Sequence, residues 1–175
     1  MNVTIRQMRG ADRAGLMDIL QGIPQFQGFD VAVAAEVIDC YLNKGTPSGY
    51  QVLVAEEKQG LAGFICFGPT PLTEGTWDIY WEAVAPQRQG KGIGRALIKA
   101  AEAEAGQSRA RQVLVETSSI SSYEKTVSFY KHNGYEIISK VPDFYSSGDD
   151  RLILRKIIKK DNNQSQSTGT SIQQS

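Results

Sequence analysis

Hydrophobic and polar residues alternate along this chain with two different periods. Where apolar side chains recur at every second position the pattern predicts strands, and where they recur at every third or fourth position it predicts helices. Strands are predicted at 3–6, 52–55, 61–67, 77–85, 113–117, 135–141 and 151–158. Helices are predicted at 12–20, 31–42, 92–105 and 121–132. This order, a strand-rich half followed by alternating strands and helices, predicts an α/β (α+β) fold with a mixed sheet that carries helices on both faces.

Local signals mark the ends of several of these elements. Short polar residues cap the starts of helices, and glycine ends them. The polar, aromatic run Pro142–Asp150 is expected to be a loop before the last strand. The expected caps are Asp12 and Ser121 or Ser122, and the expected stops are Gly106 and Gly134.

Length and composition indicate one globular unit. A chain of 175 residues can bury a substantial core, and 41% hydrophobic with 22% charged residues are ordinary globular values. We predict a single domain over residues 1–160. The polar tail at 161–175 has almost nothing to bury, so we expect it to be disordered.

Charge and cysteine content narrow the classes of partner. The 19 basic and 19 acidic residues balance, so nothing favours a nucleic acid or an anionic membrane. No apolar run reaches membrane-spanning length, and the N-terminus lacks a signal-peptide core. Cys40 and Cys66 are isolated and stand in no metal-ligand spacing. We therefore expect reduced packing cysteines in a cytoplasmic protein that holds no metal.

A glycine-rich turn opens the third predicted helix. Gly90, Gly92 and Gly94 stand at alternate positions, and strong helix formers follow them. Such a turn is an anion site, because unpaired backbone N–H groups and the positive end of the helix dipole point the same way. The turn therefore predicts a bound pyrophosphate.

Two familiar phosphate loops do not fit this turn. A Walker A loop needs Ser or Thr after its Gly-Lys pair to hold magnesium, and Gly92 follows Lys91 here. The dinucleotide fingerprint needs a third glycine where Arg95 stands. The pyrophosphate belongs to another kind of cofactor.

Two sequence blocks identify that cofactor through a family resemblance. The pattern Val84-x-Pro86-x-x-Gln89-x-x-Gly92-x-Gly94 resembles the acetyl-coenzyme A loop of the GNAT superfamily of N-acetyltransferases. The later block Tyr123-x-x-Thr126-x-x-Phe129-Tyr130-x-x-x-Gly134-Tyr135 resembles that superfamily's fourth helix and following strand. The resemblance runs from roughly Val3 to Ile158. It implies the GNAT fold, a mixed and mostly antiparallel sheet of about seven strands whose fourth and fifth strands splay apart.

The resemblance also implies which residues hold acetyl-CoA as co-substrate. Pantetheine would pair with the strand edge at Glu82–Val84, and the Val84 N–H would face the thioester carbonyl. Tyr123 stands where many members of the family carry an asparagine that touches the coenzyme. The expected binding residues are Ala83, Val84, Gln89, Gly90, Lys91, Gly92, Ile93, Gly94, Arg95 and Tyr123.

Tyr130 falls on the family tyrosine that assists the departing thiolate. A phenol titrates near ~10 and a thiol near ~8.5, so full proton transfer is uphill by roughly 2 kcal/mol. We therefore expect Tyr130 to stabilise the sulfur as a hydrogen-bond donor. The alternative is that Phe129 and Tyr130 are aromatic residues that pack the core.

Three carboxylates are candidates for the base that deprotonates the acceptor amine. Asp78 occupies the position of the glutamate base in the histone-acetylating branch of the family, and Glu82 stands close to the expected thioester. With unbroken alternation Asp78, Tyr80 and Glu82 share one face of their strand, whereas a bulge would separate them. Glu116 is the third candidate. Each could instead be a solvated or salt-bridged carboxylate.

These observations predict an acetyl-CoA-dependent N-acetyltransferase in which a primary amine attacks the thioester directly in a ternary complex. The alternative is a non-catalytic acyl-CoA-binding or sensing domain. The acceptor stays open between a small-molecule amine, a peptide N-terminus and a protein lysine. The oligomeric state, monomer or homodimer, stays open as well.

Overall fold

The computed structural model describes residues 2–26 and 28–158. The predicted disordered tail at 161–175, and the predicted domain end at residue 160, lie outside the described residues.

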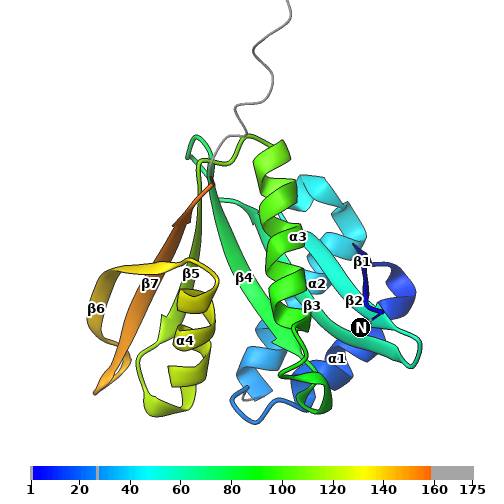
Figure 1. Cartoon of the computed structure of the whole chain (residues 1–175), viewed down its shortest axis with the longest axis horizontal. Helices are drawn as coiled ribbons and strands as arrows, with labels where there is room; N and C mark the ends of the chain where they lie inside the picture. Colours follow the sequence, from blue (N-terminus) through cyan, green and yellow to red (C-terminus); the bar gives the residue numbers. More distant parts are fainter. Residues whose placement is uncertain (1, 27, 159–175) are drawn as a thin grey trace, which may run out of the picture.

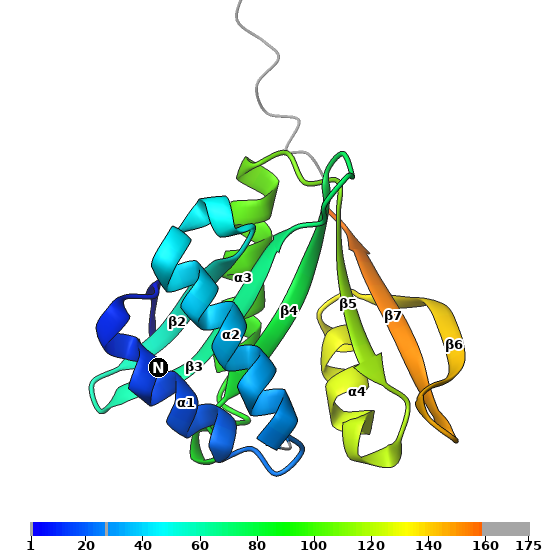
Figure 2. The same cartoon turned by 180° about the vertical axis from the view of Figure 1, so that it is seen from behind.

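The chain builds a mixed sheet and four α-helices within its described residues (Figures 1 and 2). The strands are β1 (Thr4–Gln7), β2 (Gln51–Glu57), β3 (Gly60–Pro69), β4 (Thr76–Val84), β5 (Gln112–Ser118), β6 (Glu136–Ser146) and β7 (Asp149–Ile157). The α-helices are α1 (Arg13–Gln21), α2 (Gly28–Lys44), α3 (Ile93–Gln107) and α4 (Glu124–His132). Short 3₁₀ turns are η1 (Gly10–Asp12), η2 (Thr46–Ser48), η3 (Pro86–Arg88) and η4 (Ser121–Tyr123).

The sheet has the strand order β1-β2-β3-β4-β5-β7-β6. All neighbouring strands are antiparallel except β4 and β5, which run parallel. The β4–β5 register covers only Thr76–Ile79 against Gln112–Val115. Beyond Ile79 the two strands diverge, and Figures 1 and 2 both show the gap between them. The predicted mixed, mostly antiparallel sheet with splayed fourth and fifth strands is confirmed.

Helices cover both faces of the sheet. The side chains of α3 recur at helical spacing and pack against one face, with Tyr130 of α4 in the same cluster. Figure 2 shows α1 and α2 across the opposite face, where Leu16, Leu20 and Ile38 are buried. The buried residues of α3 are Ile93, Leu97, Ile98, Ala101 and Ala105.

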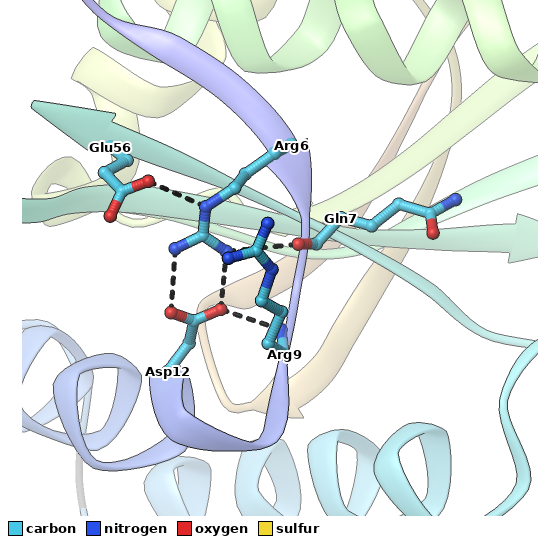
Figure 3. Close-up of polar contacts among 5 residues, drawn as sticks. All are labelled: Arg6, Gln7, Arg9, Asp12 and Glu56. Carbon is cyan, nitrogen blue, oxygen red and sulfur yellow. Dashed lines mark hydrogen bonds and ion pairs between the residues drawn. The ribbon is translucent and has the colours of Figure 1, made fainter.

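Asp12 does not cap α1 as expected (Figure 3). Its carboxylate instead accepts two hydrogen bonds from the Arg6 guanidinium, at 2.7 and 2.9 Å, and one from the Arg9 backbone N–H at 2.7 Å. Arg6 also donates to Glu56 on β2 at 2.7 Å. A charged guanidinium is a stronger partner than a helix amide, so Asp12 binds Arg6 of β1, which in turn links to β2 through Glu56.

Two other expected helix ends also differ from the structure. Gly106 lies inside α3, which continues to Gln107 and ends where Ser108 donates its N–H to Glu104. Neither Ser121 nor Ser122 caps α4, because these residues form η4 and Tyr123 directly precedes the helix. Gly134 follows α4 and has a φ of 90°, a left-handed conformation that suits glycine. A glycine that ends a helix is expected to have this conformation.

The expected loop Pro142–Asp150 is mostly strand. β6 continues to Ser146 and β7 begins at Asp149, although their register shifts between Val141 and Ser146. Two carboxylates hold this irregular hairpin together: Asp150 accepts the Asp143 N–H at 2.9 Å, and Asp143 accepts the Gly148 N–H at 2.7 Å. Side-chain hydrogen bonds to the backbone replace those that the irregular ladder lacks.

Candidate active site

A cavity of about 560 Å³ lies where β4 diverges from β5. Its walls come from the α1–α2 connection, the end of β4, the glycine-rich turn, the start of α3, and α4. The lining residues include Ile23, Gln25, Phe26, Glu82, Ala83, Val84, Arg88, Gln89, Gly90, Gly92, Ile93, Gly94, Arg95, Tyr123, Lys125, Thr126, Phe129 and Tyr130.

The glycine-rich turn has the backbone that an anion site needs. Gly90 and Gly92 have φ values of 74° and 77°, which other residues adopt only with strain. Gly92 directly precedes α3, and its carbonyl accepts the first bond of the helix from Ala96. The N–H groups at the start of α3 therefore lack partners within the helix, next to the cavity.

The side chains around this turn are arranged partly as expected. Gln89 donates to the Val84 carbonyl at 3.1 Å and so joins the turn to the end of β4. Lys91 donates to the Gln87 carbonyl at 3.3 Å and does not line the cavity. Arg88 and Arg95 are the arginines in the lining, and Arg88 was not singled out from the sequence.

The edge of β4 that faces β5 is open beside the cavity. Ala85 donates its N–H to Ala62 on the β3 side at 2.9 Å. Successive N–H groups of an extended chain point to opposite edges, so the Val84 N–H points into the gap. An extended ligand arm can pair with this edge in the way a further strand would.

A bulge in β4 separates two of the candidate carboxylates. Cys66 pairs with Trp81 but Phe67 pairs with Ile79, which leaves Tyr80 as an extra residue. Ile79 packs in the core beneath α3, whereas Trp81 packs on the face beneath α1 and α2.

The shared face of Asp78, Tyr80 and Glu82, expected for unbroken alternation, is therefore absent. Asp78 accepts a hydrogen bond from the Thr70 hydroxyl at 2.6 Å and is outside the cavity lining. Glu82 points to the other face and lines the cavity.

Glu82 and Tyr130 meet at the cavity. The Tyr130 hydroxyl donates to Glu82 Oε2 at 2.8 Å, and Tyr130 is only 4% exposed. The second carboxylate oxygen, Oε1, is buried and has no hydrogen-bond partner among the described residues. The sequence showed each residue as a candidate but gave no sign that they form a pair.

This environment favours the neutral form of both groups. Burial raises the pKa of Glu82 to about 8, although the Tyr130 hydrogen bond lowers it. Burial raises the pKa of Tyr130 well above its ordinary value, and the negative charge and hydrogen bond of Glu82 raise it further.

Gly94 makes room for this pair. A Cβ atom at Gly94 would lie 3.0 Å from Glu82 Oε1 and 3.1 Å from the Phe129 ring. The first turn of α3 therefore packs directly on the carboxyl group, which closes that side to water.

The remaining predicted residues lie at the edges of the site. Tyr123 lines the cavity, and its hydroxyl is 3.5 Å from the Gln25 carbonyl. Glu116 pairs with Arg151 at 3.5 Å and is not in the lining. The wall formed by Ile23, Gln25 and Phe26 comes from a connection whose sequence carries no motif for a ligand.

Residues 2–26 and 28–158 hold no group of three or more His, Cys, Asp or Glu side chains suited to a metal ion. None of the helices described there is both long and apolar enough to cross a bilayer.

Comparison with known proteins agrees with this geometry. A family model described as an acetyltransferase (GNAT) domain matches residues 48–137. A protein from Desulfovibrio desulfuricans assigned to the GNAT family of acetyltransferases is 35% identical, over 90% of this chain and 100% of that chain, with a TM-score of 0.87. A search of curated proteins found no match.

More distant structures share the fold. The ribosomal-protein-S18-alanine N-acetyltransferase from Escherichia coli is 17% identical, over 93% of this chain and 98% of that chain, with a TM-score of 0.72. The yncA protein from Salmonella typhimurium, solved with its cofactor acetyl-CoA, is 21% identical, over 91% of this chain and 95% of that chain, with a TM-score of 0.70. The match to the family model and the similarity to the D. desulfuricans relative show that this chain is an acyltransferase and a member of the GNAT family of acetyltransferases.

Proposed function

We propose that this protein transfers an acetyl group from acetyl-CoA to a primary amine by direct attack within a ternary complex. One observation carries the proposal. A single cavity is lined by a phosphate-type turn, by an open strand edge and by a buried tyrosine–carboxyl pair. Those are the parts needed to hold a pyrophosphate, a pantetheine arm and a thioester.

The cavity has a suitable place for the charged end of acetyl-CoA. The N–H groups at the start of α3 suit the pyrophosphate, and Arg95 adds positive charge there, while Arg88 in the lining is paired with Glu57 at 3.1 Å. The open edge of β4 at Ala83–Val84 would pair with pantetheine. The Val84 N–H would then stabilise the oxyanion that forms when the amine attacks, a contribution of about 3–4 kcal/mol for one such donor.

Direct attack is favoured over a covalent acyl-enzyme. Cys66 is fully buried, and burial raises the pKa of its thiol to about 12, which leaves no thiolate near neutral pH. Neither Cys66 nor Cys40 lines the cavity. Both thiols are free, and we propose a cytoplasmic protein in accord with that reduced state.

The acceptor is proposed to be a small-molecule or peptide amine. The E. coli relative acts on an alanine of ribosomal protein S18, as its name states. An α-amine, with a pKa near ~7.8, costs only about 1 kcal/mol to deprotonate at pH 7, whereas a lysine amine costs about 4.6 kcal/mol. An amine with a low pKa therefore needs less help from a base.

The test is acceptor-dependent release of free thiol from acetyl-CoA. A panel of polyamines, amino acids, aminoglycosides and peptides would be assayed with the wild-type protein and with Tyr130→Phe. Tyr135→Phe is a matched control, because Tyr135 is also a buried tyrosine bonded to a glutamate, Glu102, but lies outside the cavity lining. Turnover that survives Tyr135→Phe and is lost in Tyr130→Phe supports the proposal. Failure of acetyl-CoA to bind at all would overturn it.

A further inference from the structure

We propose that Glu82 is a proton reservoir behind Tyr130, and that its neutral carboxyl group replaces the proton that Tyr130 gives to the departing thiolate. This inference rests on the proposed function and assigns a role in it to Glu82. Glu82 acts through Tyr130, so it is a positioning and proton-supplying residue and does not itself touch the sulfur.

The geometry places the two groups in series. The Tyr130 hydroxyl and Glu82 Oε2 are 2.8 Å apart, and both residues line the cavity. Glu82 Oε1 is buried without a hydrogen-bond partner among the described residues, and the first turn of α3 packs against it at Gly94. The hydrogen bond between Oε2 and the Tyr130 hydroxyl therefore gives the carboxyl proton a direct path to the tyrosine oxygen.

The surroundings of Glu82 favour a carboxyl group that keeps its proton. An ionised carboxylate with one oxygen buried and unpaired is costly, whereas the neutral acid is much less so. The polar groups that face it are the hydroxyl of Tyr130 and, further off, that of Tyr135, both neutral. Gly94 of α3 packs against Oε1, and the apolar ring of Phe129 from α4 packs against the same glycine.

Tyr130 alone would be a poor acid. Its pKa lies well above the ordinary value of about 10, while a free thiol titrates near ~8.5. A tyrosine that gave up its proton without replacement would leave a buried tyrosinate beside Glu82. The pKa of Glu82, about 8, is close to that of the thiol, so the proton transfer from Glu82 to sulfur is nearly balanced.

The acceptor nitrogen bonds to the acetyl carbon, the C–S bond breaks, and its electron pair goes to sulfur. Sulfur takes the Tyr130 proton, and the tyrosine oxygen takes the proton of Glu82 across the same 2.8 Å contact, with the direction of that hydrogen bond reversed. Glu82 is left as a carboxylate, and the proton lost by the acceptor nitrogen returns to it through solvent.

The test uses coenzyme A, the product of any such transfer, and needs no acceptor. The ultraviolet absorbance of the thiolate gives the pKa of the bound coenzyme thiol, with desulfo-coenzyme A as the blank that cancels the protein's own thiols and tyrosines. In the wild-type protein ionised Glu82 accepts the Tyr130 hydrogen bond and so keeps that hydroxyl from the thiolate, and Glu82→Gln should lower the thiol pKa by about 1 unit. Glu102→Gln, which alters the matched Tyr135–Glu102 pair outside the cavity lining, should leave it unchanged.

A double-mutant cycle decides whether the connection runs through the hydroxyl. In the Tyr130→Phe background the effect of Glu82→Gln on the thiol pKa should disappear. An effect of equal size with and without the Tyr130 hydroxyl, or no effect of Glu82→Gln at all, overturns the reservoir while leaving the acetyltransferase proposal intact. Absence of coenzyme binding overturns the proposed function itself, so the two failures are distinguishable.

Discussion

The hydroxyl of Tyr130 lies 2.8 Å from Oε2 of Glu82, and this bond joins α4 to β4 where the sheet opens. Both residues line the cavity. Their contact brings a candidate acid and a candidate carboxyl group together in a buried environment that shifts the pKa of each.

Replacing Tyr130 tests its role in turnover. Tyr130→Phe removes the hydroxyl but keeps the ring that packs against Phe129 and Tyr135. We expect kcat to fall about a hundredfold or more, as on loss of a general acid, with the Kd for acetyl-CoA nearly unchanged. Steady-state kinetics and calorimetry check this, and an undiminished kcat would remove Tyr130 from the chemistry.

Glu82 should set the upper limit of the pH range for activity. The protonated form is the active one in the proposed reservoir, and burial raises its pKa to about 8. We expect kcat to fall about tenfold per pH unit above that value in the wild-type protein. Glu82→Gln should be slow at all pH values and show no such decline. Measuring kcat with an acceptor amine of low pKa avoids titration of the amine itself.

The same pKa predicts a pH-dependent stability difference. A carboxyl group with a folded pKa above its unfolded value holds its proton longer in the folded state, so stability falls as pH rises from the unfolded pKa to the folded one. The slope is at most about 1.4 kcal/mol per pH unit. As the pH rises from 5 to 8, urea unfolding should therefore show the stability of Glu82→Gln increasing relative to that of the wild-type protein. A difference that is constant with pH would contradict the raised pKa.

Asp78→Asn tests the other strand-four carboxylate. Asp78 lies beyond the bulge, is bonded to Thr70 and is outside the cavity lining, so kcat should stay near the wild-type value. The measurement is the thiol-release assay at neutral pH, beside Glu82→Gln. A loss as large as that of Glu82→Gln would mean that Asp78 reaches the reacting amine.

Gly94→Ala tests the packing of α3 on Glu82. The new methyl would lie 3.0 Å from the carboxyl oxygen and 3.1 Å from the Phe129 ring, so one of them must move. We expect a loss of about 1–2 kcal/mol, since overpacking outweighs the better helix propensity of alanine. Gly106→Ala is the matched control in the same helix, because its methyl would meet only Ile158 at 3.5 Å. Gly106→Ala should gain about 0.5–1 kcal/mol of stability. Equal changes in stability for Gly106→Ala and Gly94→Ala in urea unfolding would refute the crowding at Gly94.

Asp12→Asn tests the anchor between β1, β2 and α1. Asp12 is 8% exposed, and hydrogen bonds from Arg6 hold the pKa of its carboxyl below its usual range. Losing this charge should cost about 2 kcal/mol in urea unfolding at pH 7. The pKa of Asp12 is lower in the folded than in the unfolded protein. The difference in stability between the variant and the wild type should therefore shrink as the pH falls through the folded-state pKa. Asp39→Asn, at the exposed pair with Arg13, should change stability little, and equal losses would argue against the anchor.

The sequence by itself determined the order of the elements and the position of the phosphate-type turn. Both are local properties: apolar periodicity specifies helix or strand within a short window, and Gly90 and Gly92 are required where φ is positive. The motif around Tyr130 also runs without interruption from η4 through α4 to the residue before β6, so a single stretch of chain carries it.

The tertiary structure decided which side chains meet. Whether Asp78 and Glu82 share a face depends on the bulge at Tyr80, which arises from the pairing of β4 with β3 and not from the β4 sequence alone. The bond between Glu82 and Tyr130 joins two segments far apart in the chain, and no local pattern records it. The raised pKa of Glu82 follows from burial beneath α3, since only the packed fold removes water from a carboxyl group that the sequence shows as an ordinary acid.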